Sequence, residues 1–343
     1  MNSTVLKLIA IITMIIDHVG LRLTANNLIL RGIGRLAFPI FAFQLVEGYK
    51  HTKNLNKYKL RLLVFALVSE IPYNLLLSNR ISYDKAQNIG FTLLLGLFAI
   101  ELLEKSLKYF KMLPESKNLP KDTILAFTNL FLTASLVYLA EVLKLDYKYR
   151  GMLTILILYV TTSMKKLNRV SKMSIAAILL AITYSSVTSM PIHIIPNSDF
   201  TIPLQMLATF SIIFIGLYNG RKGRTLVEFI ENLIEVKAGI RDKKSSSITK
   251  VKCSARDEKG NRIEVEVIEP ASAKAKSKDN TDNLRDFETN IKEIATREVA
   301  RYAIDKWRQT KVREILNTIC KYSTYIIYPL HIFIIYVIAN NIK

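Results

Sequence analysis

The stretch Val5–Leu23, with the sequence VLKLIAIITMIIDHVGLRL, is long and apolar enough to cross a bilayer, but it carries Asp17 and His18 side by side. A transmembrane helix needs about 20 consecutive, mostly apolar residues. A charge near the centre of such a helix costs roughly 3 kcal/mol on insertion scales, so ionisable residues there usually have a partner, a cavity or a chemical role. We therefore expect the function of this chain to depend on Asp17 and His18.

The composition of the whole chain also indicates a membrane protein. Half of its 343 residues are apolar, and the mean hydropathy is +0.23. Recurring apolar runs predict an all-α polytopic membrane bundle of about nine transmembrane helices, in which the two shortest runs are alternatively tilted or partly re-entrant. The runs cover residues 4–23, 31–49, 60–78, 89–104, 123–143, 151–164, 172–189, 203–219 and 319–340.

The basic residues predict the orientation of the bundle. Loops that stay in the cytoplasm are enriched in Lys and Arg. The connections at residues 50–61, 105–121 and 165–172 are strongly basic, whereas residues 185–202 contain no Lys or Arg. We therefore expect a cytoplasmic N-terminus and an external C-terminus.

The net charge of +20 comes mostly from basic residues that flank the apolar runs. This distribution favours membrane lipids as partners and argues against nucleic acid. The two cysteines, Cys253 and Cys320, fall on or beside the predicted cytoplasmic side, where thiols stay reduced. We expect neither a disulfide nor a metal site.

A long polar segment interrupts the pattern of apolar runs before the last one. We expect transmembrane helices 1–8 within residues 1–222, a small inserted cytoplasmic α+β segment at 223–318, and the final transmembrane helix at 319–343. A docking or oligomerisation module, which binds a protein partner or a second copy, is the favoured interpretation; an engineered fusion is the alternative.

Periodicity predicts the elements of this insert. Alternating apolar and polar residues indicate two strands joined as a hairpin, and apolar steps of three or four indicate two helices separated by a polar linker. The helices are expected over Thr225–Ala238 and 284–302, the strands around 251–255 and 263–267, the hairpin connection at Arg256–Asn261 and the linker at Ala271–Asn283.

Other ionisable and polar residues fall within or beside the apolar runs. Each alone also fits a structural role, such as an interfacial anchor or a hydrogen bond to a neighbouring helix. Together they predict a polar interior, which in a membrane bundle forms a substrate pathway or a reaction site. His18 is the first candidate for catalysis, because imidazole exchanges a proton near neutral pH. The other members are Asp17, Arg35, Glu47, His51, Glu70, Asn88 and His331.

Several motifs occur in a fixed order along the chain. They are Met14–Gly20, Arg35–Thr52, Ser69–Asn74, Asn88–Gly96, Asp146-Tyr147 with Gly151, Tyr218–Gly220 and Tyr328–His331. In this order they resemble the TraX family of bacterial membrane proteins, over about residues 1–222 and 319–340. The long insert is a departure, because in the family the motif at Tyr218–Gly220 normally leads by a short basic loop into the final span.

The resemblance implies an enzyme related to polytopic acyltransferases, because the family's named member is associated with N-terminal acetylation of conjugative pilin subunits. It implies a protein of the bacterial cytoplasmic (inner) membrane that uses acyl-CoA or acetyl-CoA as co-substrate. A protein or glycan at the membrane or cell surface would be the acyl acceptor.

An acyl-CoA thioester is already activated, so the protein needs a base and a group that stabilises the oxyanion. We expect His18 to be the base, Asp17 to pair with Arg35 or to fix a neighbouring helix, and His331 to be a second base or to polarise the carbonyl. The predicted substrate-binding residues are Arg35, Glu47, His51, Glu70 and Asn88.

Two other classes of function fit the same residues. A transporter or proton-coupled channel would also place ionisable groups along a membrane pathway. A non-catalytic membrane scaffold would use the insert to recruit a partner. Uptake without an acyl donor would favour the first, and partner binding that needs the insert but not His18 would favour the second.

Overall fold

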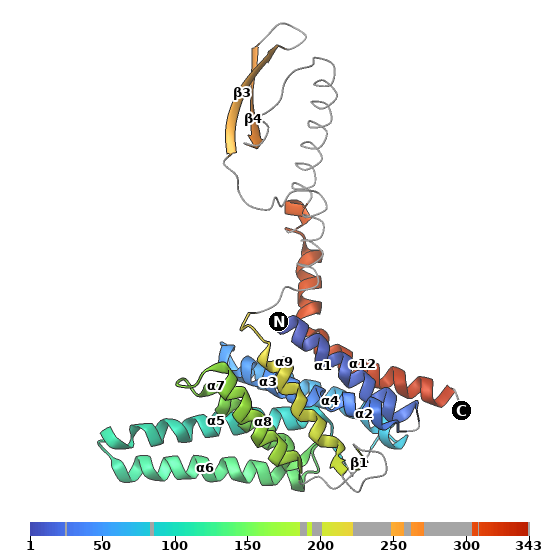
Figure 1. Cartoon of the computed structure of the whole chain (residues 1–343), viewed down its shortest axis with the longest axis vertical. Coiled ribbons are helices and arrows are strands. Elements are labelled where there is room, and N and C mark those ends of the chain that lie inside the picture. The colour runs from blue at the N-terminus through green and yellow to red at the C-terminus, as the bar shows by residue number, and fades with distance from the viewer. Residues whose placement is uncertain are drawn as a thin grey trace. The chain divides into compact units, whose positions relative to one another are not determined.

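Helices form most of the chain in the computed structural model (Figure 1). The model describes residues 1–24, 26–82, 86–185, 191–193, 201–221, 248–256, 262–270, 304–307 and 309–341. The chain divides into one compact unit of Met1–Gly223 with Tyr322–Lys343, and a second of Arg224–Lys321.

The first unit begins with nine α-helices. These are α1 (Ser3–Arg22), α2 (Leu28–Gly34), α3 (Ala37–His51), α4 (Leu55–Ser78), α5 (Ile89–Met112), α6 (Leu119–Val142), α7 (Lys148–Ser163), α8 (Arg169–Ser185) and α9 (Ser211–Gly216). Short 3-10 helices lie at Leu113–Glu115 and Leu204–Phe210. The last helix, α12 (Lys311–Asn341), begins in the second unit and ends in the first.

Every predicted apolar run coincides with helical structure in the described residues. By length and hydropathy, four helical segments there are able to cross a membrane: Ser3–Arg22, Leu28–His51, Leu55–Ser78 and Leu119–Val142. Leu204–Gly216 and Tyr325–Asn341 are shorter apolar helices. The membrane class is therefore supported, while the number of nine spans stays a prediction.

The second predicted run is interrupted at Arg35. Helix α2 ends at Gly34 and α3 begins at Ala37. Pro39 explains this position, because a residue without a backbone N–H fits the first turn of a helix but not its interior. The break places Arg35 between two helices, where its side chain reaches several elements at once.

Asparagine side chains cap several helices, which helps to fix where the helices begin. Asn2 accepts a hydrogen bond from the Val5 amide at 3.0 Å, and Asn88 accepts one from Gly90 at 2.8 Å. Helix α4 has a proline in its interior, Pro72, and continues through it. Between the predicted runs 172–189 and 203–219, where no element was predicted, β1 (Pro191–His193) pairs with β2 (Thr201–Pro203) in antiparallel register.

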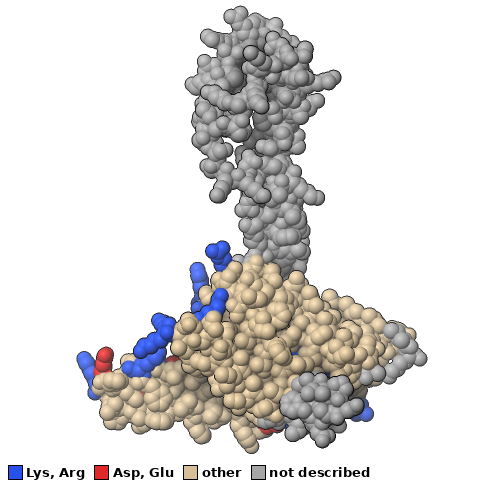
Figure 2. Space-filling view, viewed as in Figure 1, with Lys and Arg blue, Asp and Glu red and all other residues tan. Residues whose placement is uncertain are grey.

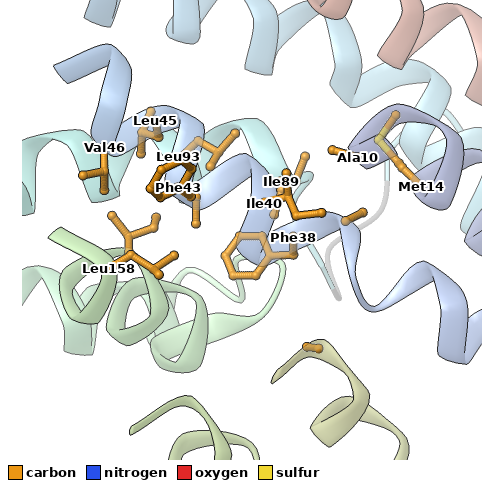
Figure 3. Packing of buried hydrophobic residues seen from close by; sticks show 14 of the residues in the cluster. Ala10, Met14, Phe38, Ile40, Phe43, Leu45, Val46, Ile89, Leu93 and Leu158 are labelled. Carbon is orange, nitrogen blue, oxygen red and sulfur yellow. The ribbon is translucent and has the colours of Figure 1, made fainter. Parts of the chain in front are cut away.

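Helix α3 occupies the centre of the first unit and contacts α1, α5, α7 and α9. Buried apolar side chains from these helices pack into one core (Figure 3). Between membrane helices such packing stabilises the bundle through van der Waals contact rather than through the removal of apolar surface from water. Figure 3 labels Ala10 and Met14 of α1, Phe38, Ile40, Phe43, Leu45 and Val46 of α3, Ile89 and Leu93 of α5, and Leu158 of α7.

Helix α6 packs against α5 and α7 and leaves large apolar side chains uncovered, as Phe131 and Tyr138 illustrate, each 71% exposed. An apolar outer surface of this kind suits contact with lipid.

Lys and Arg side chains gather along one edge of the unit in the view of Figure 2. The basic residues 50–61, 105–121 and 165–172 lie where α3 meets α4, α5 meets α6 and α7 meets α8. The direction of insertion stays a prediction.

In the second unit, β3 (Ile248–Arg256) and β4 (Arg262–Pro270) form an antiparallel pair. Both predicted strands are therefore present, and the register pairs Val251 with Val267 and Cys253 with Val265. The helices predicted at Thr225–Ala238 and 284–302, the linker at Ala271–Asn283 and residues 257–261 lie outside the described residues. The assignment of 223–318 as a cytoplasmic α+β insert stays a prediction.

Candidate functional site

Two histidines from opposite ends of the chain meet in the first unit. His18 Nδ1 on α1 lies 2.8 Å from His331 Nε2 on α12. The two rings are nearly parallel, with centroids 5.0 Å apart at an angle of 12°, as an in-plane hydrogen bond between them requires. Tyr328 packs edge-on against both rings. His331 is 8% exposed and His18 is partly buried, so most of the pair is enclosed by the surrounding helices.

The hydrogen bonds assign the tautomer of each neutral ring. His331 Nδ1 lies 2.8 Å from the carbonyl oxygen of Ile327. A carbonyl oxygen only accepts, so His331 Nδ1 carries the hydrogen and His331 Nε2 presents a lone pair. That lone pair accepts from His18 Nδ1–H. His18 Nε2 is therefore left unprotonated, which is the state that a general base requires.

Asp17, the neighbour of His18, joins α1 to the break between α2 and α3. Its Oδ1 lies 3.3 Å from Arg35 Nη2 and 3.6 Å from Arg31 Nε, so the predicted pair with Arg35 is present. The helices approach closely at this point, because a Cβ added to Gly34 would lie 2.2 Å from Asp17 Cβ. Only a glycine at position 34 leaves room for the carboxylate.

Arg35 has further partners on other elements. Its Nη1 donates to Gln205 Oε1 at 3.4 Å, and its guanidinium hydrogen-bonds to Tyr147 and acts electrostatically on Asp146. Burial raises the pKa of Asp146 to about 6, while the nearby Arg35 works against this rise. Arg35 thus interacts with residues from α1, from the 3-10 helix Leu204–Phe210 and from the turn before α7.

Glu70 and Asn88 form a second polar contact, between α4 and α5. The Asn88 amide and backbone N–H both donate to Glu70 Oε2, the latter at 3.3 Å. Asn88 Nδ2 also donates to the carbonyl of Ala66 at 2.8 Å. Among the described residues Glu70 Oε1 is buried without a hydrogen-bond partner.

Glu47 and His51 lie at the other end of α3. Glu47 Oε2 is 4.0 Å from His51 Nδ1, and the His51 side chain is 72% exposed. Twelve residues separate Arg35 from Glu47, and at 1.5 Å per residue this places them roughly 18 Å apart along the chain axis. The five predicted substrate-binding residues therefore lie in different places: Glu47 and His51 are at one end of α3, Arg35 precedes the other end, and Glu70 and Asn88 join α4 to α5.

Sequence reasoning did not assign five residues to this site. Asp146, Tyr147 and Tyr328 stand within the motifs, but nothing in their spacing indicates that they approach Arg35 or the histidines. Arg31 was noted only as four residues from Arg35, and Gln205 has no local signal. In the described part of the chain, no group of three or more His, Cys, Asp or Glu side chains is placed to hold a metal ion.

Comparison with known proteins assigns the chain to a family. A family model described as TraX protein matches residues 2–227. A segment of 110 residues is 36% identical to the probable fimbrial assembly protein FimC, serogroup H1, of Dichelobacter nodosus, covering 28% of this chain and 43% of that protein. A segment of 66 residues is 39% identical to an uncharacterized protein of Rickettsia prowazekii, covering 19% of this chain and 25% of that protein.

The matched segments thus span less than half of either relative. No solved structure matches the chain. The family model covers 226 of the 343 residues, 2–227, and its match agrees with the ordered motifs around Asp17-His18, Asn88 and Asp146-Tyr147. With its apolar helices and its sheltered histidine pair, the chain belongs to the TraX family of membrane proteins.

Proposed function

We propose that this protein is a membrane acyltransferase, which moves an acyl group, such as acetyl, from acyl-CoA to an amine or hydroxyl of a membrane or cell-surface acceptor. The observation that carries the proposal is the hydrogen bond between His18 Nδ1 and His331 Nε2, which leaves His18 Nε2 free to take a proton. A base that is held in one tautomer by a second group is the usual requirement for activating a nucleophile.

In the proposed reaction the acceptor's lone pair attacks the thioester carbonyl carbon while its proton moves to His18 Nε2. The carbonyl π electrons become an oxyanion, which the Arg35 guanidinium is suited to stabilise. When the oxyanion collapses, the carbon–sulfur bond breaks and the thiolate of CoA takes the proton from His18. The products are the acylated acceptor and free CoA, and His18 returns to its starting state.

The position of the site supports an acceptor on the external side. Arg35 precedes α3, whereas Lys50 and His51 end it, and these ends are about 20 Å apart. If the basic loops face the cytoplasm, the histidine pair lies in the opposite half of the bilayer. The similarity to a probable fimbrial assembly protein supports a surface appendage subunit as one acceptor of this class, and so a role in pilus assembly or conjugation.

The test is acyl transfer by the full-length protein in proteoliposomes, with radiolabelled acetyl-CoA and a peptide that has a free N-terminus. His18→Ala should lower turnover by about a hundredfold or more. Ile12→Ala is a matched control, because Ile12 lies on the same helix and is 47% exposed. Equal turnover in the wild type and His18→Ala would contradict the proposal. Peptide or ion uptake without acetyl-CoA would favour a transporter.

A further inference from the structure

The segment that joins α6 to α7 has an unusual backbone conformation. Lys144, Tyr147 and Lys148 have positive φ angles of 55°, 61° and 50°. Residues with a Cβ rarely adopt this left-handed region, and an aromatic residue there is particularly uncommon. Such strain persists only where the surrounding structure holds it, and it is concentrated at functional sites.

Hydrogen bonds from another part of the chain hold this segment in place. The backbone N–H of Gln87 donates to the carbonyl of Lys144 at 3.0 Å, and the backbone N–H of Asp146 donates to the carbonyl of Gln87 at 3.0 Å. Thr92 Oγ1 donates to the Asp146 carbonyl at 2.7 Å. Between them, Leu145 is 4% exposed and anchored in a small core. The backbone that precedes Tyr147 is thereby fixed to α5 and to the residues before α5.

The Tyr147 ring is also fixed. It stacks on Phe38 with centroids 4.2 Å apart at an angle of 13°. A Cβ added to Gly151 would lie 2.9 Å from Tyr147 Cβ and 3.3 Å from Phe38 Cζ, so the glycine lets the first turn of α7 pack closely against both residues. The ring therefore keeps its hydroxyl in a set position.

That hydroxyl has a defined hydrogen-bond role. The Arg35 guanidinium only donates, so the Tyr147 oxygen accepts from it and keeps its own hydrogen as a donor. Burial raises the pKa of Tyr147, so the hydroxyl stays protonated at neutral pH. Arg35 also lies within electrostatic range of His18. The Tyr147 hydroxyl is thus held at Arg35, whose Nη2 lies 3.3 Å from Oδ1 of Asp17, the residue before the proposed base.

We propose that Tyr147 is a catalytic residue, whose O–H donates to the oxyanion beside Arg35, and that the Lys144–Lys148 turn exists to hold it there. This inference rests on the proposed acyl transfer. In the step concerned, electrons from the carbonyl double bond move onto oxygen as the acceptor attacks. The Tyr147 O–H hydrogen-bonds to that oxygen without giving up its proton, and the bond weakens when the oxyanion collapses and the thiolate leaves.

The experiment compares wild type, Tyr147→Phe and Tyr138→Phe as full-length protein in proteoliposomes. Tyr147→Phe keeps the ring that stacks on Phe38 and removes the hydroxyl, so its thermal unfolding should match that of the wild type. Loss of one oxyanion donor should lower kcat by about 10²- to 10³-fold with little change in KM. Tyr138 is 71% exposed on α6 and serves as the matched control.

A fluorinated tyrosine at position 147 provides a second readout. Fluorine lowers the pKa of the phenol, so the protonated donor is lost at a lower pH and the alkaline limb of the pH–rate profile should move to lower pH. A merely structural tyrosine would not move this limb. Full activity of Tyr147→Phe would overturn the inference, and so would a loss of activity that only matches a loss of folded protein. In either case, acyl transfer by the wild type would still support the proposed function. Absence of wild-type turnover would overturn both.

Discussion

His18 Nδ1 and His331 Nε2 lie 2.8 Å apart although 313 positions separate them in the chain. The carbonyl of Ile327 fixes the hydrogen on the other nitrogen of His331, and this in turn leaves His18 Nε2 free. In this arrangement His331 orients the base. It is therefore a positioning residue, and the earlier expectation that it is itself a second base is not needed.

His331→Ala should lower kcat by about 10- to 100-fold, because His18 loses the acceptor that fixes its tautomer. His331→Gln should recover part of this loss, since an amide oxygen is able to accept from His18 Nδ1–H. Steady-state kinetics of both variants, with KM measured separately, test the role. Equal activity of the Ala and Gln variants would argue against an orienting hydrogen bond.

Asp17→Asn should destabilise the fold by about 3 kcal/mol, because Arg31 and Arg35 would keep their positive charges in a sheltered site without the carboxylate. Unfolding of the reconstituted protein by a denaturing detergent measures the change. A double-mutant cycle with Arg35→Gln separates the direct pair from other effects. Additive losses in the cycle would show that the two residues are not coupled.

Gly34→Ala should destabilise the protein by about 1–3 kcal/mol, because the new Cβ would overlap Asp17 and force α1 and α2 apart. Gly216→Ala is the matched control: the nearest atom to its added Cβ is Met173 Cγ at 3.7 Å, an ordinary contact. The same unfolding assay compares the two variants. Similar stability of Gly34→Ala and Gly216→Ala would contradict a close approach between Gly34 and Asp17.

The stability of the wild type, relative to Asp146→Asn, should rise as pH falls from above 6 towards 4. Burial raises the pKa of Asp146 from 3.8 to about 6 in the folded protein, so the folded state takes up a proton in a range where the unfolded carboxyl remains charged. Unfolding at several pH values measures this difference. A difference that stays constant across this range would contradict the raised pKa.

The sequence was sufficient for the class of protein and much of the helix pattern, because apolar runs of spanning length carry that signal locally. It did not predict that His18 and His331 touch, since this contact depends on how α1 packs against α12. Glu47 and His51 were expected to face the cytoplasm and attract the anionic end of acyl-CoA; they lie at the end of α3 away from Arg35, and their binding role stays a prediction. The role of Tyr147 depends on a left-handed backbone that an aromatic residue does not indicate.

Mass spectrometry of cell-surface proteins and glycans provides the most direct test of acyl transfer by His18. Cells that contain the wild-type protein, the His18→Ala variant at an equal level, or no protein should be compared. We predict an acyl adduct on a surface molecule in the first case and its absence in the other two. The same adducts in all three cells would contradict the account.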